Sequence, residues 1–292
     1  MKLPTVLLAL LFTTLPLGAA EKLRVSSFST ILTELAGQIG GERVTVTGHV
    51  KPGIDPHDFQ PKPADLKIVA SAQLILLSAK HMEGYVNKLQ DGAGAKGVLL
   101  EVGADFASLK IADEHDPSRL VDDPHWWHSL TNMEKATKTV RDALSRISPE
   151  DKALFTANAA QYLERLDALK KWSKKKLAEL PRDRRQLVTS HEAFQYFCKE
   201  NGFTLHAIEG VSRSDQPSSK KVAEIVRVIK EAGVKAIFPE SLSNPKVLKE
   251  ITRETGAKIG PELHGDGLGE GGASTFDGMY RHNVTAIVDA LK

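Results

Sequence analysis

The chain has 292 residues, of which 41% are hydrophobic and 26% are charged, and its formal net charge is +2. This length allows two lobes with separate cores, and the composition is that of a soluble globular protein. So small a net charge, without a basic run that has aromatic residues interleaved, excludes the usual kind of nucleic-acid-binding protein.

The first 20 residues predict a secretory signal peptide. Lys2 gives a positive start, Val6–Phe12 is an unbroken apolar run, and small residues precede a cut before Glu21. No Cys lies at the cut, which argues against a lipid anchor, and no later apolar run is long enough to span a membrane. We therefore expect a periplasmic protein that is soluble after residues 1–20 are removed. Cys198, the only cysteine, should be buried as a small hydrophobe.

Strands alternate with helices through residues 21–147, the predicted N-terminal lobe. This alternation indicates right-handed βαβ units and a mostly parallel sheet. A capping box at Thr131–Glu134 marks the start of the last helix of the lobe. The expected strands are 23–28, 44–50, 74–78 and 98–102, and the expected helices are 31–39, 64–72, 83–89 and 131–147.

Residues 148–181 predict one long helix between two lobes. Ser148 and Pro149 form a helix start, and apolar residues recur every three or four positions from Phe155 to Trp172. Nothing breaks this pattern before Pro181. A helix of about 32 residues would be roughly 48 Å long, more than one lobe needs. We interpret it as a rigid strut.

The α/β rhythm resumes in residues 182–292, the predicted C-terminal lobe. The fold expected from the whole pattern is α/β, with two similar lobes of mostly parallel sheets that are joined by one long rigid helix. A binding site would then lie in the cleft between the lobes. The expected strands are 186–190, 203–208, 234–238 and 257–263, and the expected helices are 192–201, 220–232, 245–255 and 276–291.

Four candidate ligands lie in loops, most of them just after predicted strands, where ligands of parallel sheets bind. His57 follows strand 44–50, His191 follows strand 186–190, and Asp266 follows strand 257–263. His125 lies in the loop that leaves the first lobe, between two carboxylates and two tryptophans. Three imidazoles and one carboxylate form a tetrahedral set that suits Zn²⁺ and tolerates Mn²⁺ or Fe²⁺.

Each candidate also has a purely structural explanation. His191 could cap a helix, and Asp266 could be a turn residue in a Gly-rich loop. Trp126 and Trp127 could pack in the core while the histidines beside them form only local hydrogen bonds. The prediction therefore depends on the coincidence of four residues and not on any one of them.

These segments resemble the metal-binding solute-binding proteins of bacterial zinc and manganese ABC transporters, the cluster A-I family. The resemblance follows the family order and covers essentially the whole mature chain. It implies that His57, His125, His191 and Asp266 bind a metal ion, which a monomeric receptor delivers to a membrane permease. The matching segments are Pro56–Pro61, Asp123–Trp127, Ser190–Phe197, Phe238–Glu240 and Asp266–Gly269.

The resemblance also bears on the choice of metal. Family members with a His at the third position, here His191, favour zinc more often than members with Glu, so Zn²⁺ is the expected cargo and Mn²⁺ or Fe²⁺ the alternative. His128 stands where members commonly have an Asp, and it could be an alternative ligand. Only His115 stands in place of a long His-rich loop. Carboxylates that could orient the imidazoles are Asp58, Asp123, Glu192 and Glu240.

A second functional class is a secreted zinc hydrolase, which needs three protein ligands, a bound water and a general base. The pair His191-Glu192 matches the start of a His-Glu-x-x-His motif, but Gln195 stands where the second His would be. Four protein ligands would also leave no open position on the metal. We therefore expect no enzyme. A metal buffer or adhesin without a transporter stays open as a third reading.

Overall fold

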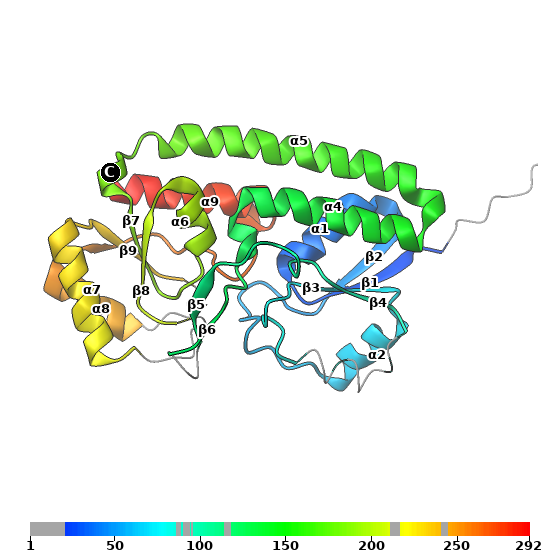
Figure 1. The fold of residues 1–292 in the computed structure, drawn as a ribbon, viewed down its shortest axis with the longest axis horizontal. Helices are drawn as coiled ribbons and strands as arrows, with labels where there is room; N and C mark the ends of the chain where they lie inside the picture. The colour runs from blue at the N-terminus through cyan, green and yellow to red at the C-terminus, as the bar shows by residue number, and fades with distance from the viewer. Residues whose placement is uncertain are drawn as a thin grey trace, which may run out of the picture.

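The computed structural model describes residues 21–85, 89, 94, 96–113, 118–210, 217–240 and 245–292. The predicted signal peptide, His115 and residues 86–88 of the helix predicted over 83–89 lie outside these residues. The described residues form two four-stranded sheets, each entirely parallel, and one two-stranded hairpin (Figure 1). Two lobes of parallel sheet with a long helix above them confirm the predicted α/β fold. The lobe boundaries, 21–147 and 182–292, stay predictions.

The first sheet has the strand order β2-β1-β3-β4. All four residues of β3 are buried, as expected for a strand covered on both faces. Helices α1 and α4 lie above this sheet and α2 lies below it (Figure 1). The elements are β1 (Leu23–Ser27), α1 (Thr30–Gly40), β2 (Val44–Gly48), α2 (Pro63–Ser71), β3 (Leu74–Leu77), β4 (Val98–Glu101) and α4 (Leu130–Ile147).

The second sheet has the strand order β10-β9-β7-β8. Helix α9 lies on the same side as α4, while α7 and α8 lie at the outer end of the lobe (Figure 1). Cys198, on α6, is buried as predicted. The elements are β7 (Gln186–Thr189), α6 (Gln195–Asn201), β8 (Thr204–Ala207), α7 (Ser219–Ala232), β9 (Ala236–Phe238), α8 (Pro245–Thr255), β10 (Lys258–Ile259) and α9 (Phe276–Leu291).

The linker helix is shorter than the sequence predicted. α5 (Lys152–Leu177) has 26 residues, and a separate 3-10 turn, Pro149–Asp151, precedes it. The prediction of about 32 residues was wrong because the Ser148 hydroxyl donates to a carboxylate within that turn instead of starting the α-helix. At the other end, the Arg185 guanidinium donates to the carbonyl of Leu177 and so provides a partner for the last turn.

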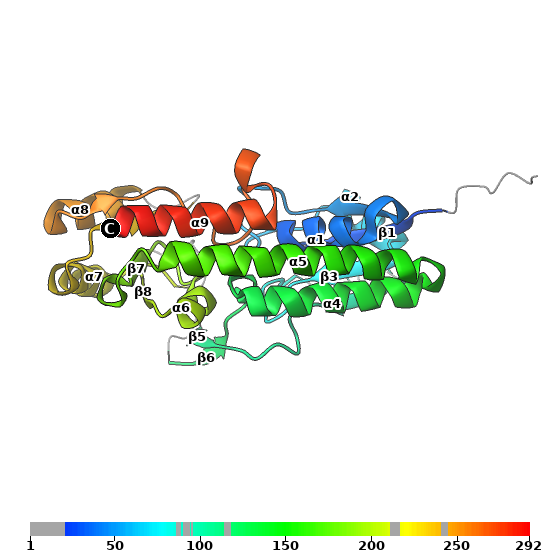
Figure 2. The same cartoon turned by 90° about the horizontal axis from the view of Figure 1, so that it is seen from above.

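α5 crosses the whole molecule above both sheets. It packs against α1 and α4 of the first lobe and against α9 of the second. Seen from above, α5 runs between α4 on one side and α1 and α9 on the other (Figure 2). A single hydrophobic cluster joins residues of both lobes and of α5. The linker therefore forms part of a shared core and does not hang free between the lobes.

Helix α4 begins at Leu130, one residue before the predicted range of 131–147. The capping residue is Ser129, whose hydroxyl accepts from the backbone N–H of Asn132. The carboxylate of Glu200 accepts from the N–H of Leu130 and so satisfies a further free donor. The predicted capping box at Thr131–Glu134 was wrong because Ser129 caps the helix instead.

Two segments near the candidate ligands are less regular than predicted. The strand expected over 257–263 is reduced to β10, and Leu263 joins the sheet only through a bridge to Glu240. Helix α6 begins at Gln195 instead of residue 192, because the N–H of Glu192 donates to the carbonyl of Gly210. As a result, His191 and Asp266 lie in loops and not in a helix or strand.

The sequence missed one element between the lobes. Strands β5 (Lys110–Ala112) and β6 (Leu120–Asp122) form an antiparallel hairpin in a stretch that read as a polar loop. An ion pair between Lys110 and Asp122 lies across this hairpin. Its short strands and exposed charges conceal the alternation that would reveal a strand.

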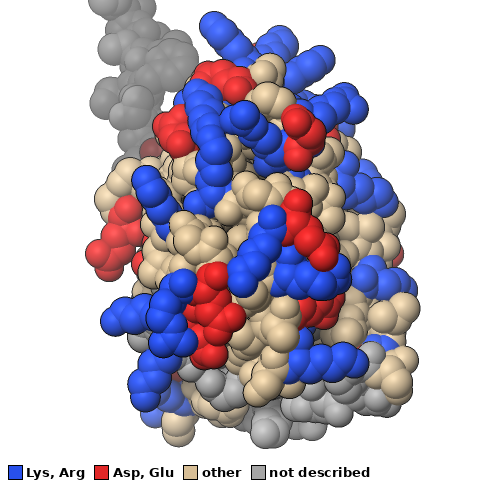
Figure 3. Space-filling view, turned by 90° about the vertical axis from the view of Figure 1, so that its left-hand side faces the viewer, with Lys and Arg blue, Asp and Glu red and all other residues tan. Residues whose placement is uncertain are grey.

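The outer end of the C-terminal lobe is rich in basic side chains. Lys and Arg outnumber Asp and Glu on this face (Figure 3). Lys235 and Lys258 lie at the amino ends of β9 and β10, so this face is opposite the edge where the strands end. The cluster Lys170–Lys176 on α5 is largely exposed, as expected for the solvated face of a helix.

Candidate metal centre

Four side chains from both lobes meet at one point. One donor atom from each of His57, His125, His191 and Asp266 lies within 4.8 Å of the others, and the described residues contain no other such group. All four lie in loops, beyond β2, β6, β7 and the Leu263 bridge. The structure therefore brings together every residue that the sequence singled out as a ligand. Their role in binding metal stays a prediction.

The spacing of the donor atoms fits a small tetrahedral ion. The Nε2 atom of His125 lies 3.2 Å from Nε2 of His57 and 3.3 Å from Oδ1 of Asp266. The same Oδ1 atom lies 3.0 Å from Nε2 of His191 and 3.7 Å from Nε2 of His57. Ligands at about 2.0 Å from a tetrahedral ion are about 3.3 Å apart, so these four distances are compatible with such a shell.

Buried carboxylates hold two of the imidazoles from behind. Nδ1 of His125 donates to Oδ1 of Asp123 over 2.8 Å, and both side chains are fully buried. Nδ1 of His191 lies 2.8 Å from Oε2 of Glu240, which is equally buried. When a metal ion displaces the proton from Nε2, a carboxylate beside Nδ1 favours the tautomer whose Nε2 lone pair faces the centre. Two of the four predicted orienting carboxylates are therefore in place.

The other two predicted carboxylates have different surroundings. The Glu192 carboxylate accepts from the amide of Gln195, and burial raises its pKa. No contact between Asp58 and a candidate ligand is found among the described residues. Instead, Asp55 accepts from the backbone N–H of His57 over 2.9 Å. His57 is therefore positioned through its backbone.

The charges at the centre support one another. Burial opposes ionisation of Asp266, but the charge of His191 and hydrogen bonds from three imidazoles hold the pKa of this carboxyl well below its usual range. Burial also opposes the charged form of His191, yet Asp266 and Glu240 raise its pKa well above the ordinary value. Asp123 and Asp266 raise the pKa of His125 against the same effect of burial. A cation that binds here must displace protons from these imidazoles.

The two tryptophans serve both packing and positioning. Trp126 is 0% exposed and Trp127 is 2% exposed. The indole N–H of Trp126 donates to the carbonyl of Ser78, and the indole N–H of Trp127 donates to the carbonyl of Gly265. The core-packing interpretation and the functional interpretation of this motif are therefore compatible.

His128 lies outside the group of four donor residues in this structure, and the sequence left open whether it acts as an alternative ligand. Its ring stacks against Phe194 with ring centroids 4.4 Å apart, and Nε2 lies 2.7 Å from the carbonyl oxygen of Gly265. Burial lowers the pKa of His128 to about 3, which keeps the ring neutral with Nε2–H as the donor. His128 thus acts on the backbone beside Asp266 and not on a metal ion.

Three further histidines have surroundings that do not involve the four donor residues. His206 bonds to Gln186, His282 donates to the carbonyl of Glu262, and His81 is exposed. Sequence reasoning missed Thr30, whose hydroxyl accepts from the N–H of Leu268 near Asp266. The partners are 238 positions apart, and a threonine at a helix start carries no signal for such a contact.

A comparison with protein families identifies the chain. The sequence profile of the family described as "Zinc-uptake complex component A periplasmic" matches residues 25–290. The chain belongs to this family. Its members are substrate-binding proteins of ABC transporters and not enzymes, so the chain is a metal-binding receptor of this class. The resemblance that the sequence motifs indicated is confirmed.

Individual relatives of the family carry different metals in their names. The chain is 33% identical to the manganese-binding lipoprotein MntA of Bacillus subtilis, over 94% of this chain and 92% of the relative. It is 31% identical to the iron-binding protein YfeA of Yersinia pestis, over 93% and 87%. The solved structure of the periplasmic zinc-binding protein TroA from Treponema pallidum superposes with a TM-score of 0.84 at 27% identity, covering 93% of this chain and 99% of TroA. Within the described part of the chain, no helix has the length and apolar character needed to cross a membrane.

Proposed function

We propose that this protein captures Zn²⁺ in the periplasm and delivers it to the permease of an ABC transporter. The proposed ligands are His57, His125, His191 and Asp266. The observation that carries the proposal is the meeting of their four donor atoms at one point, with separations of 3.0–3.7 Å for the contacts around Asp266 and His125. We also propose that residues 1–20 are removed on export and that the receptor works as a monomer, since one chain supplies every ligand.

The donor set favours zinc over manganese. Imidazole nitrogens suit Zn²⁺, whereas Mn²⁺ prefers oxygen donors and binds most nitrogen-containing sites more weakly. Three of the four proposed donors are imidazoles, and the buried Asp123 and Glu240 increase the basicity of two of them. The names of the relatives include manganese, iron and zinc, so the argument for zinc comes from the donors.

Four protein ligands also argue against a zinc hydrolase. A catalytic zinc keeps one position open for water or substrate, whereas four protein ligands close a tetrahedral shell. The motif that suggested a hydrolase lacks its second histidine, and Gln195 in that place donates to Glu192. A closed shell is suited to holding the ion until the protein rearranges.

The test is a competition titration of chelator-stripped protein, residues 21–292, with Zn²⁺ and Mn²⁺. We expect one Zn²⁺ per chain, bound far more tightly than Mn²⁺, and a large loss of affinity in His125→Ala. His206→Ala is the matched control, because this half-buried imidazole bonds to Gln186 away from the centre. If the protein binds Mn²⁺ more tightly than Zn²⁺, the proposed cargo becomes Mn²⁺ while the receptor role is kept. Failure to bind either metal stoichiometrically would overturn the proposed function.

A further inference from the structure

The loop that carries Asp266 is anchored to the C-terminal lobe at both of its ends. Before the loop, the Asn283 side chain accepts from the N–H of His264 over 3.0 Å and donates to its carbonyl over 2.9 Å. After the loop, the N–H of Gly269 donates to the carbonyl of Ala273 over 3.0 Å. Both partners belong to the C-terminal lobe, so residues 264 and 269 must move with that lobe.

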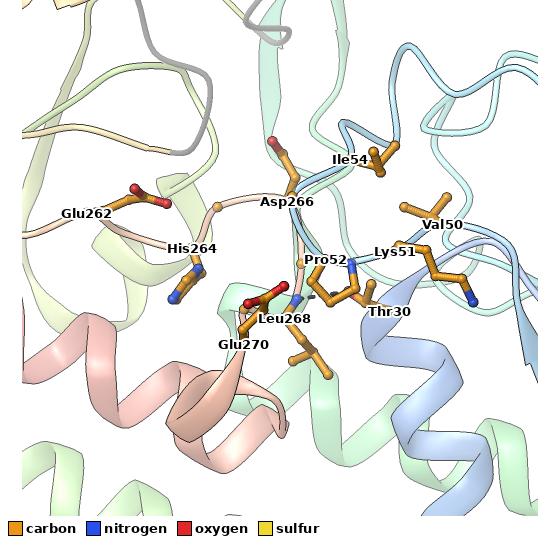
Figure 4. A pocket seen from close by; sticks show the side chains of 14 residues that line it. Thr30, Val50, Lys51, Pro52, Ile54, Glu262, His264, Asp266, Leu268 and Glu270 are labelled. Carbon is orange, nitrogen blue, oxygen red and sulfur yellow. Dashed lines mark hydrogen bonds between the residues drawn. The ribbon is translucent and has the colours of Figure 1, made fainter.

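Between these anchors, residues of the other lobe hold the backbone. The carbonyl of Gly265 accepts from Nε1 of Trp127 over 2.9 Å and from Nε2 of His128 over 2.7 Å. The N–H of Leu268 donates to the Thr30 hydroxyl over 2.8 Å, a contact that is drawn as a dashed line in Figure 4. Asp266 therefore lies between three hydrogen bonds that all come from residues of the predicted N-terminal lobe.

Close packing on both sides of Asp266 leaves room only for glycine at positions 265 and 267. A Cβ atom at Gly265 would lie 2.1 Å from a carboxylate oxygen of Glu240, and one at Gly267 would lie 2.4 Å from the Thr30 hydroxyl oxygen. Both distances are shorter than any real contact, so the loop needs glycine on each side of Asp266 to approach both lobes at once.

The same loop borders an open cavity between the lobes. This cavity, of about 270 Å³, is lined by Val50–Ile54 from one lobe and by Glu262–Glu270 from the other. Figure 4 shows the two segments facing each other, with Thr30 and Leu268 at their junction. Solvent can therefore reach this side of the junction.

We propose that Thr30, Trp127 and His128 form a latch that holds Asp266 at the metal and sets the rate of metal release. The proposal rests on the proposed function, because release has meaning only for a bound ion. If the lobes separate, the anchors at 264 and 269 draw the loop away, and the three latch bonds must break. The ion then loses Asp266, its only anionic ligand. The latch residues touch no metal and act as positioning residues.

The first test uses Thr30→Val, which keeps the size of the side chain and removes the acceptor. Zinc-loaded protein, residues 21–292, is mixed with an excess of chelator, and release is followed by stopped flow. We expect release about three- to tenfold faster than in the unmodified protein, the range for loss of one neutral hydrogen bond. Thr30→Ser restores the acceptor and should release zinc at the original rate. Thr45→Val, on an exposed position of β2, is the control for the same chemical change.

A second variant keeps the test decisive if Thr30→Val folds poorly. His128→Phe removes the donor and retains an aromatic ring against Phe194. It should also accelerate release, with one zinc per chain and an unchanged association rate. A merely structural role would lower the melting temperature without changing the release rate. Release within twofold of the unmodified rate in both folded variants would overturn the latch, whereas failure of the unmodified protein to bind zinc would overturn the proposed function instead.

Discussion

The proposed metal centre draws on two regions that are built differently. His191 follows a buried strand, its side chain is 0% exposed, and a buried carboxylate stands behind its ring. His57 lies in the loop after β2, its side chain is 10% exposed, and its backbone N–H donates to the carboxylate of Asp55. The position of His191 is thus established during folding, whereas that of His57 retains more freedom. Preorganised groups lose less conformational entropy on binding.

This comparison predicts unequal effects of removing the two imidazoles. His191→Ala should weaken zinc binding by about a thousandfold, because it removes a ligand and leaves the buried Glu240 without its imidazole. His57→Ala should weaken binding by only about ten- to a hundredfold, since water can enter from solvent and take the vacant position. Competition titrations with a calibrated chelator measure both. Equal losses would refute the distinction between the two regions.

The carboxylates near the two imidazoles provide a second test of this comparison. Glu240→Gln should weaken zinc binding by about ten- to a hundredfold, the usual effect of losing a partner of a ligating imidazole. Asp58→Asn is the matched control, a carboxylate beside His57 in sequence, and we expect a change of less than about threefold. If the two variants behave alike, the carboxylate behind His191 has no special role.

The pH dependence tests the electrostatics of the buried region. Burial opposes the imidazolium of His191 and His125, but nearby carboxylates raise both pKa values above 6.5. Protons therefore compete with the metal above pH 6.5, and zinc affinity should keep rising from about pH 6 to pH 8, by up to about a hundredfold per unit if two protons are released. Competition titrations across this range measure the slope. Constant affinity would contradict proton release from these residues.

The stability of the metal-free protein should depend on pH in the opposite direction, because it should fall as the pH rises. A raised pKa in the folded state means that His125 and His191 stabilise the fold fully below their unfolded pKa of about 6.5. This contribution is lost as the pH rises through the folded values. The melting temperature of the metal-free protein should therefore fall as the pH rises above 6.5. The fall should be smaller in a His191→Gln variant, which lacks one of these two imidazoles. A scan of melting temperature at several pH values, with and without zinc, provides the measurement.

The smallest effect is expected at an exposed imidazole near His57, on the less buried side of the centre. His81 lines a cavity of about 450 Å³ that also contacts His57. Because its side chain is exposed and outside the group of four donors, His81→Ala should change zinc affinity by less than about twofold. A titration beside His57→Ala makes the contrast direct. A loss comparable to that of His57→Ala would add His81 to the site.

Local signals in the sequence were sufficient for most of the regular structure. The apolar period and the preceding Thr275 cap define α9 at the predicted residues, and Pro245 and Gly256 bound α8 in the same way. The four proposed ligands were also visible, because parallel sheets collect functional residues beyond the ends of their strands. These features depend on neighbours within one or two turns of chain, which a sequence displays directly.

Only the tertiary structure decided the details that depend on distant partners. Glu200 accepts from the first backbone N–H of α4, and Arg185 donates to the last carbonyl of α5, although neither residue lies within the helix that it contacts. His128 became a donor to Gly265 instead of a ligand, and Thr30 acquired a partner 238 positions away. A side chain carries the same chemistry in any fold. Its partner depends on how the two lobes pack, and that information is spread over the whole chain.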